Sequence, residues 1–93
     1  MVVLVSELPL HFPETQSLKK KRQILSSLKG RLHQRFNLLV AEINHQDLWQ
    51  RSTPALVMVS NDGCHADEVI SKAINFVEQD DRLQLQSVDL EER

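Results

Sequence analysis

Apolar residues recur along the chain at two spacings, one typical of strands and one typical of helices. Runs that alternate or that consist of β-branched and apolar residues predict four strands, at residues 2–8, 37–44, 54–60 and 83–90. Apolar side chains three, four or seven positions apart predict two helices, at about residues 17–35 and 63–79. The expected order is therefore strand, helix, strand, strand, helix, strand.

Residues that end or begin secondary structure lie between these elements. Pro9 and Pro13 mark the end of the first strand and the turn after it. Either Thr15 or Ser17 offers a side-chain oxygen to cap the first helix, and Asp62 is expected to cap the second.

This order predicts an α+β fold of the ferredoxin-like βαββαβ type, a sandwich of a four-stranded antiparallel sheet with two helices on one face. A length of 93 residues fits one domain, and we expect residues 1–93 to form a single ferredoxin-like domain. In the last predicted strand the apolar rhythm slips by one position between Leu85 and Val88, which indicates a bulge or an edge position. The architecture hosts many unrelated functions and says little about activity.

Both faces of the predicted sheet are apolar. A strand with one face in water alternates apolar and polar residues, whereas residues 2–5, 38–41 and 55–59 carry apolar side chains on both sides. The face away from the helices is therefore expected to be covered, and a second copy of so short a chain is the simplest cover. We expect a homodimer that pairs through sheet faces or edges.

Composition restricts the class of protein. Apolar residues make up 41% and charged residues 26% of the chain, which is ordinary for a globular domain. The single cysteine has no partner for an intrachain disulfide, and the first residues lack the basic region of a secretion signal. No apolar run approaches the roughly 20 residues that cross a bilayer. These features predict a cytoplasmic protein without membrane insertion.

Charge is distributed unevenly along the chain. Residues 15–41 hold seven of the 11 lysines and arginines and none of the 13 acidic residues. A solvated amphipathic helix can carry such charges on both flanks of its apolar stripe. The first turns, however, carry lysines where the helix dipole disfavours cations, and a positive helix start suits a phosphate backbone. Both interpretations stay open, and the nucleic-acid interpretation assigns the contacts to Lys19, Lys20, Lys21, Arg22, Lys29, Arg31 and Arg35.

Several short strings together resemble the bacterial YlxP-like family. They are S-L-K-x-K-R at residues 17–22, R-F-N at 35–37, V-A-E-x-x-H-Q-D-L-W-Q-R at 40–51, S-x-D at 60–62 and H-A-D at 65–67. The resemblance spans nearly the whole chain and implies a small ferredoxin-like fold with no established biochemical activity. In several bacteria the family's genes lie beside those for ribosome-binding factor A and for transcription and translation factors, which implies a role near RNA by association.

Two positions of the first helix depart from the family's pattern. Lys20 stands where the family usually has Glu, and Gly30 stands where a polar helix former is more usual. The first departure makes this helix more basic and removes any role for a carboxylate at that position.

The segment from His45 to Arg51, H-Q-D-L-W-Q-R, places polar and aromatic side chains at alternating positions. An imidazole oriented by Asp47 can act as a base, but no nucleophile or pocket is identifiable, so a connector whose turn Asp47 caps is the simpler interpretation. Trp49 and Arg51 are typical of interfaces, with a second subunit or with an external partner. We therefore assign partner contact to His45, Asp47, Trp49 and Arg51.

Other signals for an enzyme are weak. The chain has no glycine-rich phosphate loop and no nucleophile elbow, and the adjacent Cys64 and His65 have poor geometry for a thiolate–imidazole pair. Cys64 is expected to be a plain, partly buried thiol, and the four histidines show no zinc spacing. We expect no catalytic site, no metal and no cofactor.

These observations predict a non-enzymatic accessory protein that binds RNA, or a component of ribosome assembly or translation, through its basic first helix. The chain lacks the stacking aromatic pair and the G-x-x-G loop of common RNA modules, so contact with the RNA backbone or shape is expected. The alternative is a regulatory or small-ligand-binding homodimer that uses the loop at residues 45–51.

Overall fold

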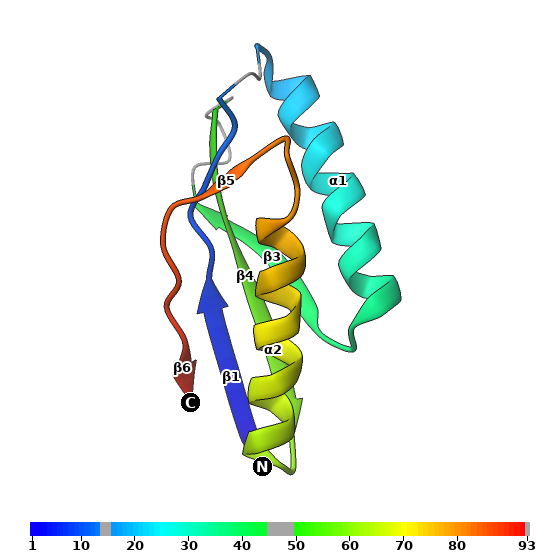
Figure 1. Ribbon diagram of the computed structural model, residues 1–93, viewed down its shortest axis with the longest axis vertical. Helices are drawn as coiled ribbons and strands as arrows, with labels where there is room; N and C mark the ends of the chain where they lie inside the picture. Colours follow the sequence, from blue (N-terminus) through cyan, green and yellow to red (C-terminus); the bar gives the residue numbers. More distant parts are fainter. Residues whose placement is uncertain (14–15, 45–49, 93) are drawn as a thin grey trace.

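Two helices and a curled antiparallel sheet make up the structure, a computed structural model that describes residues 1–13, 16–44 and 50–92 (Figure 1). The elements are, in order, β1 (Val2–Glu7), β2 (Leu10–His11), α1 (Leu18–Arg35), β3 (Leu39–Asn44), β4 (Arg51–Ser60), α2 (Gly63–Glu78), β5 (Gln84–Leu85) and β6 (Glu91–Glu92). The predicted α+β class is confirmed. No helix within these described ranges is long and apolar enough to span a membrane.

The sheet is organised around the long strand β4 (Figure 1). The greater part of β4 pairs with β1, its first residues pair with β2, and β3 lies along its other side. β6 continues beyond β1, and β5 continues beyond β2. Each of these pairings is antiparallel, and β3 forms one edge of the sheet among the strands that the structure describes.

Both helices begin at caps that the sequence predicts. The hydroxyl of Ser17 accepts a hydrogen bond from the backbone N–H of Lys20 at 3.1 Å. The carboxylate of Asp62 accepts from the backbone N–H groups of Cys64 and His65, at 3.0 and 3.3 Å. These bonds satisfy N–H groups that a helix start leaves without an intrahelical partner.

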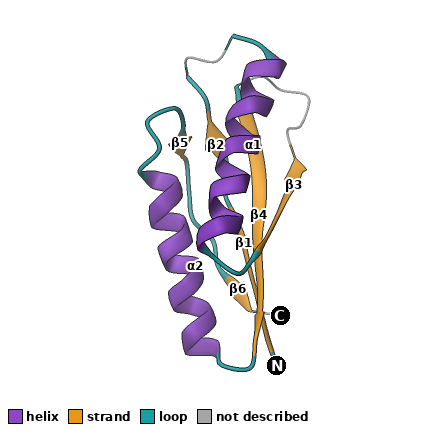
Figure 2. Cartoon of the chain, turned by 90° about the vertical axis from the view of Figure 1, so that its right-hand side faces the viewer, coloured by secondary structure: helices purple, strands orange, loops and turns teal. Residues whose placement is uncertain are grey.

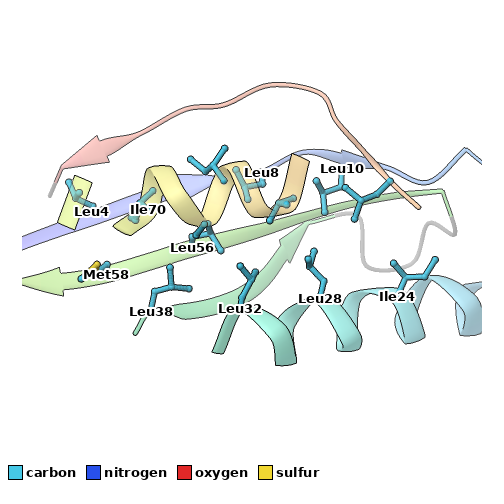
Figure 3. Packing of buried hydrophobic residues seen from close by; sticks show 14 of the residues in the cluster. Leu4, Leu8, Leu10, Ile24, Leu28, Leu32, Leu38, Leu56, Met58 and Ile70 are labelled. Carbon is cyan, nitrogen blue, oxygen red and sulfur yellow. The ribbon is translucent and has the colours of Figure 1, made fainter. Parts of the chain in front are cut away.

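The core fills the space between the sheet and the two helices, which lie on the same side of it (Figure 2). Inward-pointing side chains from alternate strand positions, among them Leu4, Leu56 and Met58, meet the apolar faces of α1 and α2. Figure 3 shows Leu28 and Leu32 directed from α1 toward the strands. The two-residue rhythm of the strands and the three-to-four-residue rhythm of the helices thus supply one common core.

Three predicted strands differ from the structure. The first, at residues 2–8, forms β1 and is followed beyond Pro9 by β2, which was not predicted. The third begins at Arg51 rather than at residue 54, so Arg51 belongs to β4 and not to the connector. The last, at residues 83–90, is interrupted: it pairs only at β5, and pairing resumes beyond it at β6. The slip in its apolar rhythm coincides with this interruption, because a strand whose inward side changes cannot keep one register. Within the described ranges, six strands therefore stand where four were expected.

Candidate functional site

The cations of α1 fall into two groups on opposite flanks of the helix. One row of side chains enters the core, and the lysines and arginines other than Lys21 are exposed on either side of this row. The flank that faces α2 carries Arg31 and Arg35. The flank that faces β3 carries Arg22 and Lys29.

Lys19 and Lys20 occupy the first turn of α1, where no acidic residue balances them. Both side chains are exposed. The aligned peptide dipoles give this end of the helix a partial positive charge, which disfavours each cation by about 0.3–1 kcal/mol. The helix start therefore attracts anions more strongly than the peptide groups alone would.

The flank of α1 that faces α2 has partners within the chain. The guanidinium carbon of Arg35 lies 4.9 Å from the ring centre of Phe76, which is a cation–π distance. Hydrogen bonds from the Arg82 side chain lower the pKa of Asp80, and the nearby charge of Arg31 adds to this effect. Arg35 thus joins α1 to α2 through Phe76, while the charge of Arg31 acts on Asp80 in the turn that follows α2.

The structure corrects one predicted nucleic-acid contact, Lys21. Its side chain is 0% exposed. The Nζ atom donates a hydrogen bond to the backbone carbonyl of Arg51 at 3.1 Å and lies 3.6 Å from Oε1 of Glu42. The same Oε1 atom accepts a hydrogen bond from the Ser52 hydroxyl at 2.9 Å. Lys21 therefore joins α1 to β3 and β4, and it cannot reach an external phosphate.

The sequence contains a signal for this burial. Lys21 lies three positions before Ile24 and seven before Leu28, so it shares their side of the helix. Glu42 lies two positions after Val40, on the inward side of β3. A cation and a carboxylate that each interrupt an apolar row predict a buried pair, because a lone buried charge is costly. Judging the lysines by their charge alone misses this pair.

The other flank of α1 borders a cavity that the sequence does not predict. Arg22, Ser26 and Lys29 line this cavity of about 250 Å³ between α1 and the sheet. Among the residues that the structure describes, neither Arg22 nor Lys29 forms a salt bridge. The cavity depends on how far α1 stands from the sheet, which no local sequence pattern reports.

Three of the four predicted partner-contact residues, His45, Asp47 and Trp49, lie outside the described residues. The fourth, Arg51, is exposed and is the first residue of β4, where it pairs with His11 of β2. The partner contact, the oriented imidazole and the ligand-binding loop at residues 45–51 therefore stay predictions.

Cys64 is exposed rather than partly buried. It lies in the first turn of α2, off the row through which this helix enters the core at Ala66 and Ile70. Within residues 1–13, 16–44 and 50–92, no group of three or more His, Cys, Asp or Glu side chains is arranged to hold a metal ion.

The face of the sheet that points away from the helices is largely apolar, with acidic side chains at the side where β6 joins it. Val5, Val57 and Leu39 are directly opposed across β1, β4 and β3, and opposed residues share one face. Leu39 is 65% exposed, and Val59, two positions along β4, is 55% exposed. Large apolar side chains thus lie in contact with water on three adjacent strands.

The fold and the cations of α1 define a small α+β protein with one strongly basic helix. The family model described as "Protein of unknown function (DUF503)" matches residues 3–90, and the chain belongs to this family. It is 31% identical over 62 residues to the "Uncharacterized protein YlxP" of Bacillus subtilis (strain 168), a match that covers 67% of each chain. The YlxP-like resemblance is thereby confirmed, and neither description names an activity.

Lys20 and Gly30, the two positions at which the sequence is expected to depart from the family's pattern, are both exposed on α1. A Cβ atom added at Gly30 meets nothing within 4 Å, so packing does not require glycine there. Lys20 adds a cation to the first turn, beside Lys19.

Proposed function

We propose that this chain is a non-enzymatic, cytoplasmic accessory protein that binds RNA, or an RNA-containing component of ribosome assembly or translation, through α1. The observation that carries the proposal is the set of exposed cations on a helix that has no acidic residue from Leu18 to Arg35. Lys19, Lys20, Arg22 and Lys29 form no salt bridge in the described part of the chain, so their charges are available to phosphates.

Lys19, Arg22 and Lys29 follow one side of α1. An α-helix rises about 1.5 Å per residue, so this row spans about 15 Å, a length over which a duplex presents several phosphates. The exposed His33 continues the row. Such contacts to phosphates give an affinity that falls steeply with salt and depends little on base sequence.

Charge reversal on this row tests the proposal. The variant Lys19→Glu, Arg22→Glu, Lys29→Glu changes exposed side chains only and leaves the buried Lys21 in place. Fluorescence anisotropy measures the Kd for a labelled ribosomal RNA fragment at about 50 and about 200 mM salt. If the contacts are to phosphates, the affinity of the wild type is expected to fall at least about tenfold between these two concentrations. The triple variant is expected to lose RNA binding at both salt concentrations.

Lys72→Glu is the control, because Lys72 is an exposed cation on α2. It is expected to keep the wild-type affinity within about twofold, since one distant charge is largely screened. Equal RNA binding by the triple variant and the wild type contradicts the proposal. So does the absence of ribosomal RNA from tagged protein isolated at low salt.

We also propose that the six strands represent the four strands of a ferredoxin-like sheet. β1 and β2 follow one another and both pair with β4, while β6 and β5 lie beyond them in the same way. Grouped in this manner, the strands and helices follow the βαββαβ order. Cross-strand NOEs that continue along β4 from β1 into β2 support this grouping, and a gap between them contradicts it.

A second copy of the chain is our proposal for what covers the outer face of the sheet. The supporting observation is the exposure of Leu39, Ile43 and Val59, at 65%, 49% and 55%. A contiguous apolar patch is unusual on a monomer, and the patch on β3 and β4 can pack against its own copy across a two-fold axis, with the acidic side chains beside β6 at its rim.

A further inference from the structure

α1 is fastened to the rest of the chain at both of its ends. Near its start, Nζ of Lys21 donates a hydrogen bond to the carbonyl of Arg51 at 3.1 Å. At its end, the cap residue Phe36 packs edge-on against Phe76 of α2, with 6.2 Å between the ring centroids. Between these attachments the middle of the helix borders the cavity of about 250 Å³. Leu28 and Leu32 pack into the core along this middle part, and beside them remains a space that the side chains of α1 do not fill.

The cavity has an apolar interior and a cationic mouth. Its interior is formed mainly by aliphatic side chains from both helices and the sheet, among them Leu8, Leu10, Leu28, Leu32, Leu56 and Val77. At the mouth, Arg22, Ser26 and Lys29 are exposed. Spacings of four and three residues place these three side chains on one side of α1. Two cations and a hydroxyl group therefore lie at the mouth, where they can contact the polar end of a ligand whose apolar part fills the interior.

Among the described residues that line the cavity, the acidic one is Glu42. Its Oε1 atom lies 3.6 Å from Nζ of Lys21 and accepts a hydrogen bond from Ser52, so its charge is already balanced from within the chain. Arg22 and Lys29 form no salt bridge in the part of the chain that the structure describes. The mouth is therefore electropositive and complementary to an anion.

The volume limits the size of the occupant. An engineered apolar cavity of roughly 150 Å³ holds benzene, and pockets for drug-sized ligands begin near roughly 300 Å³. A space of about 250 Å³ lies between these values. It suits an aromatic ring or a short alkyl chain of about six to eight carbons, and it is too small for a nucleotide or a long lipid chain.

We propose that this cavity binds a small carboxylate with an apolar body, which lies between α1 and the sheet while its carboxylate meets Arg22, Ser26 and Lys29. This site is distinct from the proposed RNA contact, because the apolar residues that line the cavity play no part in binding RNA. The two share Arg22 and Lys29, however. A bound carboxylate neutralises both cations, so it weakens RNA binding and makes α1 responsive to a small molecule.

Octanoate is the probe for this site, with octylammonium and octanol as comparisons of the same chain length. Isothermal titration calorimetry gives the Kd of each. Octanoate is expected to bind at least about tenfold more tightly than either comparison, because its carboxylate meets two cations whereas an ammonium is repelled and a hydroxyl carries no charge.

Two variants separate the interior of the site from its mouth. Leu25→Phe places a larger side chain in the cavity and is expected to weaken octanoate binding at least about tenfold. Arg22→Gln with Lys29→Gln changes exposed residues only and is expected to abolish the preference for octanoate over octanol. Arg31→Gln, on the opposite flank of α1, is the control and is expected to leave octanoate binding unchanged.

Equal affinity for the three probes, or no binding of octanoate at millimolar concentration, overturns the proposal. Undiminished octanoate binding by a folded Leu25→Phe variant also overturns it. If Leu25→Phe fails to fold, the variant Arg22→Gln with Lys29→Gln tests the site instead, and an unchanged preference for octanoate over octanol in that variant overturns the proposal. A folded Leu25→Phe variant that still binds RNA but no longer binds octanoate supports both the RNA contact and the cavity site, as separate functions. Wild-type protein that binds octanoate and no RNA supports the cavity site and overturns the RNA proposal alone.

Discussion

Lys21 and Glu42 form an ion pair whose cation is shielded from water and whose carboxylate is partly exposed. The side chain of Lys21 is 0% exposed and that of Glu42 is 30% exposed. Removing ions from water costs several kcal/mol each, and a pair offsets this cost only when further hydrogen bonds complete it. The carbonyl of Arg51 and the hydroxyl of Ser52 complete it here. The main effect of the pair is positional, since it fixes where α1 begins relative to β3 and β4.

Replacing Lys21 by alanine is expected to lower the free energy of unfolding by about 2 kcal/mol, because the change removes a charged partner of Glu42 and leaves unfilled space. Urea denaturation followed by circular dichroism measures this difference. Lys20→Ala is the matched control, since Lys20 is the exposed neighbour, and it is expected to stay within about 0.5 kcal/mol of the wild type. Equal stability of the two variants would show that the buried pair contributes nothing.

Three consecutive lysines show how far sequence alone identifies the candidate site. Lys19, Lys20 and Lys21 are adjacent in sequence and have the same charge, yet of the three only Lys21 is buried. Helical phase distinguishes it, because it continues the row of Ile24 and Leu28. The set of cations was thus predictable, and the buried member could have been recognised. The cavity was not predictable, because it depends on the distance between α1 and the sheet.

At the scale of elements, helices followed the sequence more closely than strands. α1 and α2 each begin and end within about one residue of the predicted positions, because the apolar rhythm and the caps are local signals. Strands depend on their partners. Residues 83–90 look like one strand in isolation, but they lie at the edge of the sheet, and pairing there is limited to β5 and, past residue 90, to β6.

The turn after α2 is closed by Asp80 and Arg82. Oδ1 of Asp80 accepts hydrogen bonds from the backbone N–H and Nε of Arg82, both at 2.9 Å, and Oδ2 accepts one from a terminal guanidinium nitrogen at 2.7 Å. The side-chain hydrogen bonds lower the pKa of Asp80 from its ordinary 3.8. A carboxylate with a lowered folded-state pKa adds stability above its unfolded-state pKa and loses it as the pH falls through the folded-state pKa.

Replacing Arg82 by alanine is therefore expected to destabilise the chain by about 0.5 kcal/mol at neutral pH, a small effect because exposed ion pairs are screened by water. The difference should shrink below about pH 4 and vanish once Asp80 is protonated in both proteins. Carboxyl NMR titration is expected to show a higher pKa of Asp80 in the variant. Arg22→Ala, far from this turn, is the control, and an unchanged pKa of Asp80 in Arg82→Ala contradicts the assignment.

Across the whole molecule, the basic and the apolar surfaces point in opposite directions. α1 and α2 lie on one side of the sheet, and the face with Leu39, Val57 and Val59 is the other side (Figure 2). A second copy that covers this outer face therefore leaves both α1 helices exposed. In such a dimer the two basic helices are held on opposite outer sides, and one RNA that reaches both is bound more tightly than by a single chain.

Light scattering at micromolar concentration is expected to give the mass of two chains, and Leu39→Glu is expected to give the mass of one. The reason is that Leu39 lies on the outer face directly opposite Val57, where dimerisation would bury the new charge without a partner. Asn75→Glu, which adds the same charge at an exposed position of α2, is the control and is expected to remain dimeric. If both α1 helices bind one RNA, Leu39→Glu also weakens RNA binding although every cation of α1 is unchanged. A mass of one chain for the wild type at this concentration contradicts the dimer.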